Sequence, residues 1–365
     1  MKIALLVQKH GYSFVDQADA LKEGFRRIGV DTIMMRINEF PSRQLIRYRP
    51  DVVVGVGSWH SYDAFVARPT RLGFRCVPWI VSDDAVSRHI GAYNRLPFFM
   101  TTSQYCRSVF VHDGIKSDRI VVVPEAVDDQ YWQPISWTKL KPFVETVSIQ
   151  KPGVELPFGY DLVDLKRKKI PILYTTGGDA TSKGAQETIA ALGRINKNIP
   201  WLYIVKTWPS AGSFERSIEE LTLAKKYGIL DRIHYIVGQY SQEFMLNLMN
   251  LCDIYVAPSR SEGFGLPHVE AQMCAKPVIT VDGTATKETI LHSRTGYLAK
   301  ARPFGNRVKA DVNDLAKYLT ILLTNPERRK AFGQQGRVQA QRRFGPEIVA
   351  QKMLRLLSQK KLPNL

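Results

Sequence analysis

Residues 258–271 read PSRSEGFGLPHVEA, a glycine-rich turn that carries two carboxylates. The apolar run Cys252–Ala257 predicts a buried strand before the turn, and residues 269–274 predict a helix after it. Backbone N–H groups in such a turn and the positive end of the helix dipole favour an anion such as phosphate. Glu262 and Glu270 add acceptors for hydroxyl groups. The stretch therefore predicts a site for a phosphate joined to a polyol, as in a sugar nucleotide.

Length and composition indicate a globular protein of two domains, with 365 residues, 44% of them hydrophobic and 23% charged. The four cysteines have neither metal-ligand nor disulfide spacing, which favours a reducing, cytosolic setting. The apolar segment Met1–Val7 is too short for a signal peptide or a membrane span and predicts a first strand. We therefore expect a cytoplasmic location, with peripheral association with a membrane as the alternative.

The net charge of +17 is unevenly distributed, because the last forty residues carry 10 basic and 2 acidic side chains. A helix with a solvated basic face explains such a tail most simply. Weak attraction to an anionic membrane or to a phosphorylated acceptor is a second interpretation. Nucleic-acid binding is a third, but no recognition motif accompanies the charge, so we expect no specific nucleic-acid partner.

The first third of the chain alternates short apolar runs with helical stretches, a pattern typical of a parallel sheet covered on both faces. Strands are predicted at Ile3–Val7, Asp31–Met35, Asp51–Val56, Cys76–Val81, Phe98–Thr102 and Ile120–Val123, and a helix at Phe14–Ile28. Ligands of such sheets bind in the loops beyond the carboxyl ends of the strands. Gly11, in the loop after the first strand, would allow close approach of a ligand there, although an ordinary turn explains it equally well.

Proline-rich residues 134–169 predict a crossover that is partly a long loop, and the α/β alternation restarts at Ile170. Later strands are predicted at Ile170–Thr175, Trp201–Val205, Ile233–Val237, Ile254–Ala257 and Pro277–Val281. Helices are predicted at Gly184–Ile195, Glu215–Tyr227, Gln242–Leu251, Thr286–Leu291 and Asp311–Leu323, and from Pro326 onward.

The predicted fold class is therefore α/β, with two tandem Rossmann-like, doubly wound domains that face a central cleft. The expected divisions are an N-terminal domain at 1–134, a linker at 135–169 and a C-terminal domain at 170–345. A basic helix at 346–365 packs either on the second domain or back on the first.

A second phosphate-binding candidate is the loop TTGGDATSKG at residues 175–184, which follows a strand and opens a helix. It fits neither G-x(4)-G-K-[ST] nor G-x-G-x-x-G, so classical nucleotide-binding motifs are excluded. Lys183 lies at the helix start, where the dipole disfavours a cation, which favours a functional role. Lys206 ends the next strand, so both cations are expected at one edge of the sheet, although each is also explained as a solvated surface lysine.

The pattern S-x-x-E-G-F-G-L-P-x-x-E-A from Ser259 to Ala271 resembles the hallmark of glycosyltransferase family 4, whose members are retaining enzymes of GT-B fold. The segment Val121–Asp128 resembles that family's turn at the end of the N-terminal domain, and Lys183-Gly184 resembles its diphosphate loop. Residues 277–280, Glu288 and 295–298 resemble the segments that follow the hallmark. The resemblance covers most of residues 100–345.

The resemblance implies a role for each candidate residue. Glu262 would contact the hydroxyls of the donor sugar, and Glu270 the ribose. The donor site would be completed by the backbone of Gly263, Phe264, Gly265 and Leu266, the loop glycines Gly177 and Gly178, the cation of Lys183, and Tyr240 near the base. Gly11 is a further substrate-binding candidate, in the N-terminal domain on the acceptor side. The leaving phosphate would accept the proton of an acceptor hydroxyl that attacks on the same face, so neither a metal nor a cofactor is implied.

The chain departs from the family pattern at several positions. Gly178 stands where an arginine is usual, and Lys206 is our candidate to supply the missing charge. Gly11 replaces a Gly-Gly pair, and Ser82-Asp83-Asp84 stands near the usual place of a histidine.

The leading prediction is a hexosyltransferase that uses a nucleotide-diphosphate sugar, with a glycan, a lipid or a small molecule as acceptor. One alternative is a sugar-nucleotide epimerase of similar architecture, which would need further acid/base groups. The other is a non-catalytic nucleotide- or nucleic-acid-binding protein.

Overall fold

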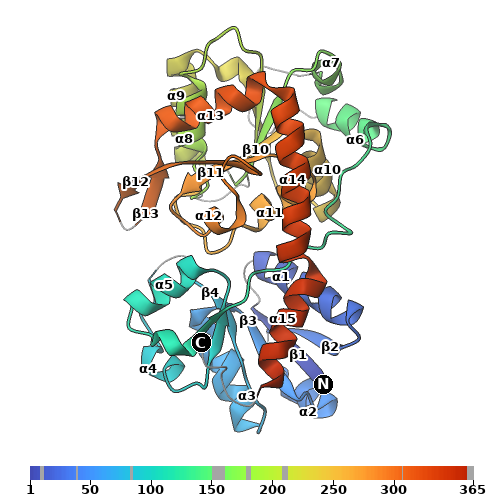
Figure 1. The fold of residues 1–365 in the computed structure, drawn as a ribbon, viewed down its shortest axis with the longest axis vertical. Helices are drawn as coiled ribbons and strands as arrows, with labels where there is room; N and C mark the ends of the chain where they lie inside the picture. The colour runs from blue at the N-terminus through green and yellow to red at the C-terminus, as the bar shows by residue number, and fades with distance from the viewer. Residues whose placement is uncertain are drawn as a thin grey trace. The chain divides into compact units, whose positions relative to one another are not determined.

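The computed structural model describes residues 1–8, 12–37, 40–82, 85–149, 161–177, 182–207, 213–305 and 307–359. Gly11, Gly178 and the pair Asp83-Asp84 lie outside these residues. The chain forms two compact units, and each is an α/β body in Figure 1. The first unit comprises Met1–Tyr131 and Gln341–Leu365, and the second comprises Trp132–Ala340.

The first unit is built on a six-stranded parallel sheet of order β2-β1-β3-β4-β5-β6. Its strands are β1 (Lys2–Gln8), β2 (Asp31–Ile37), β3 (Val52–Ser58), β4 (Trp79–Val81), β5 (Phe99–Thr101) and β6 (Ile120–Val122). Its helices are α1 (Tyr12–Arg27), α2 (Ser42–Tyr48), α3 (Arg68–Arg71), α4 (Ile90–Tyr93), α5 (Gln104–His112) and α15 (Pro346–Ser358), with short turns η1 (Trp59–Ser61), η2 (Asp63–Ala67) and η3 (Ser117–Arg119).

The continuous apolar run of β1 follows from burial of both faces of this sheet. Ile3, Leu5 and Val7 face one core, whereas Ala4 and Leu6 face the other. Successive strand side chains point to opposite faces, so a strand covered on both sides needs no polar alternation. The predicted parallel sheet is confirmed.

Helix α15 belongs to the first unit, where it packs along α1 (Figure 1). A Cβ at Gly24 of α1 would lie 2.2 Å from the carbonyl oxygen of Pro346, so only glycine permits this approach. Val349, Ala350 and Met353 are buried in the same core as β1. The division between the units falls inside α14 (Pro326–Phe344).

The second unit has a seven-stranded sheet of order β13-β12-β11-β10-β7-β8-β9. Its strands are β7 (Ile172–Thr176), β8 (Leu202–Thr207), β9 (Ile233–Val237), β10 (Ile254–Val256), β11 (Val278–Asp282), β12 (Gly296–Phe304) and β13 (Arg307–Ala310). Besides α14, its helices are α6 (Trp137–Ile149), α7 (Leu162–Arg167), α8 (Ala185–Leu192), α9 (Ser213–Tyr227), α10 (Gln242–Leu251), α11 (Leu266–Met273), α12 (Thr286–Thr289) and α13 (Val312–Thr324), and η4 spans Leu230–Arg232.

The segment predicted as a linker contains α6 and α7 and is part of the second unit. Phe143 of α6 packs edge-on against Phe244 of α10, with ring centroids 5.1 Å apart. Asn250 accepts from the N–H of Ile135 at 2.9 Å and donates to the carbonyl of Gln133 at 3.0 Å. The described part of the predicted crossover is thus largely helical, and α6 is held by its packing on α10, which the prolines did not indicate.

Other boundaries also differ from the prediction. Helix α11 begins at Leu266, directly after Gly265, and not at Val269. The strand predicted from Cys76 begins only at Trp79, with Cys76 in an isolated bridge to Val53. Strand β13, which pairs antiparallel with β12, was not predicted. Its short, basic sequence lacks the apolar run that marked the parallel strands.

A solvated basic face accounts for only part of the positive tail. The half-buried Arg329 donates to the carbonyl of Leu323 at 3.0 Å, at the end of α13. Arg337 donates to the carbonyl of Met273, the last residue of α11. Cations favour helix C-termini, so these charges stabilise the helix ends. Among the described residues, no helix has both the length and the apolar character needed to cross a membrane.

Candidate functional site

The sheet order of the second unit brings the two predicted phosphate-binding loops together. β7 pairs with β10 on one side and with β8 on the other, and all three strands run parallel. Their carboxyl ends therefore lie at one edge, where the loop after β7 and the loop after β10 become neighbours.

Direct contacts join these two loops. The N–H of Arg260 donates to the carbonyl of Ser182 at 2.6 Å, and the hydroxyl of Ser182 donates to the carbonyl of Ser261 at 3.0 Å. Gly184, which precedes α8, has a φ of +77°. A Cβ there would lie 2.4 Å from the carbonyl oxygen of Pro258. The left-handed conformation and the close approach both require glycine at this position.

Lys183 and Glu262, the two principal residues predicted from the sequence, contact each other. The Lys183 ammonium forms an ion pair with Oε2 of Glu262. Their side chains are 21% and 14% exposed, respectively, so the pair is mostly removed from water but open to it on one side. A cation and a carboxylate therefore lie at a single point between the starts of α8 and α11.

The turn before α11 is buried and tightly packed. Gly263, Phe264, Gly265 and Leu266 are all buried. Gly265 has a φ of +99°, and a Cβ there would lie 2.9 Å from Nδ1 of His268. Leu266 is the first residue of α11, so the positive end of that helix's dipole lies at this turn. The local geometry is that of an anion-binding helix start.

His268 anchors α11 to the end of β10. Its side chain is fully buried, and its Nε2 lies 2.9 Å from the carbonyl oxygen of Ala257, which also accepts from the hydroxyl of Thr280 at 2.9 Å. Burial lowers the pKa of His268 to about 4. The imidazole is therefore neutral at pH 7, and it fixes the turn instead of exchanging protons there.

Glu270 is half-buried in α11. Burial raises the pKa of Tyr255 well above its usual value, and the nearby charges of Glu270 and Glu262 raise it further. The ring of Tyr255 packs edge-on against Tyr174, with centroids 5.8 Å apart. Both predicted carboxylates thus act on one buried tyrosine of β10.

Lys206 lies in β8 opposite Thr176 of β7, beside the start of the loop that follows β7. It is only 7% exposed, and burial lowers the pKa of its ammonium group. Gly177, at the first position of the loop, has a φ of +84° and donates its N–H to the carbonyl of Lys206 at 2.8 Å. Lys206 is therefore not the solvated surface lysine of the simpler interpretation.

Tyr240 follows β9 at the edge of the sheet. Its ring stacks on Phe244 with centroids 4.0 Å apart, and its hydroxyl donates to the carbonyl of Val237 at 3.1 Å. The aromatic face is thus held by the first turn of α10, at the same end of the sheet as the two loops.

In the first unit, Gln8 marks the carboxyl end of β1. Its Oε1 accepts from the N–H of Ser58 at 2.9 Å and from the hydroxyl of Ser61 at 3.1 Å. These bonds join the ends of β1 and β3. The neighbouring candidate Gly11 lies outside the described residues.

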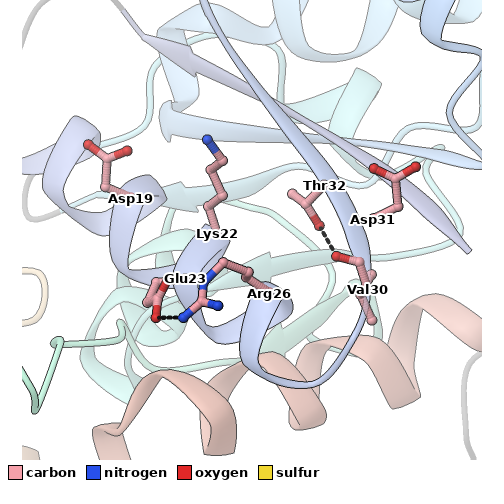
Figure 2. Close-up of a pocket in the computed structure, with 7 residues that line it drawn as sticks. All are labelled: Asp19, Lys22, Glu23, Arg26, Val30, Asp31 and Thr32. Atoms are coloured by element: carbon pink, nitrogen blue, oxygen red, sulfur yellow. Dashed lines mark hydrogen bonds and ion pairs between the residues drawn. The ribbon is translucent and has the colours of Figure 1, made fainter.

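The first unit has an open pocket of about 540 Å³ beside α1 and the edge strand β2, and Figure 2 shows the residues around it. It is lined by Asp19, Lys22, Glu23, Arg26, Val30, Asp31 and Thr32. None of these residues was predicted as functional. The mixture of charges, with Glu23 already paired with Arg26, gives the pocket no preference for one ligand class.

The sequence interpretation missed three residues that build the site, namely Arg260, Tyr255 and His268. Arg260 and His268 occupy variable positions of the hallmark pattern, and Tyr255 looks like an ordinary strand residue. The described part of the chain contains no cluster of three or more His, Cys, Asp or Glu side chains arranged to hold a metal ion.

Solved structures resemble this chain over nearly its whole length. The Anabaena protein HepE, crystallised with UDP and glucose, superposes with a TM-score of 0.71 at 16% identity, over 98% of this chain and 99% of that one. Sucrose-phosphate synthase from Thermosynechococcus elongatus superposes with a TM-score of 0.72 at 17% identity, over 98% of both chains. These neighbours and the two parallel-sheet α/β units define the GT-B fold.

Comparison of sequences finds a matching family model and several curated relatives. Residues 163–339 match the family model described as glycosyl transferases group 1. An uncharacterized glycosyltransferase of Methanocaldococcus jannaschii is 34% identical over 28% of this chain and 27% of its own length. Alpha-maltose-1-phosphate synthase of Mycolicibacterium smegmatis is 22% identical over 67% of this chain and 58% of its own length. The chain thus spans less than two thirds of the length of these curated relatives.

Proposed function

We propose that this protein is a retaining glycosyltransferase of family 4, which transfers a hexose from a nucleotide-diphosphate sugar to an acceptor hydroxyl. The contact between Lys183 and Glu262 carries the proposal. A cation suited to a diphosphate and a carboxylate suited to sugar hydroxyls meet between two glycine-preceded helix starts.

The other candidate residues complete the donor site in this proposal. Lys206, beside the start of the loop after β7, shares the diphosphate with Lys183, and the turn from Gly263 to Leu266 holds the sugar and phosphates. Glu270 binds the ribose, and Tyr240 lies beside the base. Gly11 belongs to the acceptor side.

The chemistry requires positioning more than an enzymic base. The nucleoside diphosphate departs from the anomeric carbon while the acceptor oxygen forms its bond on the same face. A leaving phosphate oxygen takes the acceptor proton, so charge balance is kept without a protein nucleophile. Lys183, Lys206 and the dipole of α11 stabilise the charge that develops on the diphosphate, and no metal is required.

Related proteins suggest the donors to test. HepE was crystallised with UDP, and a Corynebacterium glutamicum relative, 29% identical over 33% of this chain, is a GDP-mannose-dependent mannosyltransferase. Titration with UDP, GDP and ADP identifies the base, and incubation with each nucleotide sugar without acceptor measures slow hydrolysis. With a donor and its acceptor, the anomeric proton coupling of the product distinguishes retention from inversion.

Mutation of the site then tests the assignment. Lys183→Ala is expected to weaken nucleoside diphosphate binding by about tenfold or more, because it removes a charge-assisted contact. Lys317→Ala, at an exposed position of α13, serves as the matched control and leaves the affinity unchanged. Salt-sensitive binding of DNA or RNA without any nucleotide binding would overturn the proposal.

A further inference from the structure

Arg260 stands inside the hallmark segment and contacts several neighbouring elements at once. Its N–H donates to Ser182 at 2.6 Å, and its carbonyl accepts from the N–H of Val308 in β13 at 3.2 Å. Its guanidinium lies 5.4 Å from the ring centroid of Phe304 in β12. Both the main chain and the side chain of Arg260 are therefore held in place by neighbouring elements.

The guanidinium reaches the first turn of α8. Nε and one terminal nitrogen of Arg260 each lie 2.9 Å from a different oxygen of Glu187, a bidentate geometry, and Gln186 accepts a third bond at 3.1 Å. The Glu187 side chain is 6% exposed and that of Arg260 is 21% exposed. Bidentate arginine–carboxylate pairs fix orientation as well as distance.

This pair also sets the charge beside Lys183. Glu187 lies in the first turn of α8, whose start faces the proposed diphosphate site. A buried carboxylate without a cation there would repel an incoming diphosphate. Arg260 neutralises the Glu187 carboxylate, so Glu187 does not offset the positive charge of Lys183.

We infer that Arg260 is a positioning residue, which clamps the Ser182–Gly184 loop and the start of α8 to the hallmark loop so that Lys183 and Glu262 meet the donor in the correct geometry. The inference rests on the proposed function, since the donor is the ligand that Lys183 binds. Arg260 does not itself contact the reacting atoms in this account.

A thermodynamic cycle tests the inference on the full chain, with the nucleoside diphosphate that wild-type protein binds best. Arg260→Gln is expected to raise Kd about tenfold, but by less than about twofold in a Lys183→Ala background, because its effect acts through Lys183. Arg260→Lys, which keeps the charge but not the bidentate geometry, is expected to recover part of the affinity. A purely structural loss would not vanish in the Lys183→Ala background.

Arg232→Gln provides the matched control. Arg232 is a half-buried arginine of the same unit, 5.4 Å from the ring centroid of Trp201, and it donates to backbone carbonyls away from the site. The Arg232→Gln variant is expected to change the midpoint of unfolding without changing the Kd for the nucleoside diphosphate. Amide exchange adds a readout that needs no ligand, because Arg260→Gln is expected to accelerate exchange in residues 182–190.

The possible outcomes test the positioning role of Arg260 and the proposed function separately. An unchanged Kd in Arg260→Gln, or an equal loss in the presence and absence of Lys183, overturns the positioning role while the proposed function stands. Wild-type protein that binds none of UDP, GDP and ADP overturns the proposed function. In that case unchanged exchange in residues 182–190 overturns the clamp as well.

Discussion

Lys183 and Glu262, 79 positions apart in sequence, form an ion pair across the two loops at the carboxyl edge of the second sheet. The cation proposed for the diphosphate and the carboxylate proposed for the sugar thus satisfy each other in this structure. Binding of a donor must then exchange this contact for two others.

The exchange predicts opposite effects on binding and transfer when Glu262 loses its charge. Glu262→Gln is expected to tighten binding of the sugar-free nucleoside diphosphate about fivefold, because Lys183 no longer has to break an ion pair with a carboxylate before it binds the diphosphate. Sugar transfer is expected to fall by about a hundredfold. Calorimetric titration and a transfer assay measure the two effects. Glu243→Gln, at an exposed position of α10, is the control, and weaker diphosphate binding in Glu262→Gln would contradict the idea.

The close contact between the two loops predicts an unusually large loss of folding stability when Gly184 is replaced by alanine. Gly184→Ala places a Cβ 2.4 Å from the Pro258 carbonyl oxygen at a φ of +77°, whereas Gly228→Ala meets nothing within 4 Å at a φ of +66°. Gly228→Ala is expected to cost about 1 kcal/mol from backbone strain alone, and Gly184→Ala about 2 kcal/mol more. Urea unfolding compares the two variants, and equal costs would show that the loops do not touch.

The buried Lys206 predicts that donor binding is coupled to proton uptake. Burial lowers the pKa of Lys206 in the free protein, and a bound diphosphate raises it again. Between the two pKa values binding therefore takes up protons, and affinity falls as pH rises through the lowered pKa of Lys206. Calorimetry in two buffers of different ionisation enthalpy measures the uptake. It is expected to vanish in Lys206→Met and to persist in the exposed control Lys225→Met.

Two buried histidines predict loss of stability in mild acid. Burial lowers the pKa of His234 and of His268 to about 4, from the usual 6.5. Between pH 6.5 and 4 the unfolded chain binds protons that the folded chain does not, so stability falls as pH falls through this range. Each histidine is expected to contribute about 2 kcal/mol of the loss between pH 7 and pH 5.

Urea unfolding at the two pH values checks this expectation. His234→Gln is expected to show a smaller pH dependence than wild-type protein, whereas the exposed control His112→Gln keeps the full dependence. Equal pH dependence in all three proteins would contradict a neutral, buried His234.

Properties of short sequence segments were enough to predict many of the strands and the candidate site. The apolar runs of β1, β3 and β10 follow from burial of both sheet faces, and the pattern from Ser259 to Ala271 led to the GT-B class that the solved structures share. Boundaries were less reliable, since the start of α11 at Leu266 depends on how Gly265 packs against His268 and Thr286. The helices within residues 134–169 were missed because prolines interrupt the segment, while α6 packs on α10 and α7 packs on α6.

The sequence by itself determined the alternating elements, the two glycine-rich loops and the identity of Lys183 and Glu262 as candidates, because periodicity and turn chemistry are local properties. Only the tertiary structure decided that β7 and β10 are neighbours, which joins Lys183 to Glu262. It also decided that Arg260 is held by Glu187 and that Lys206 is buried. The physical reason is that strand order sets these distances and burials, and no spacing along the chain encodes strand order.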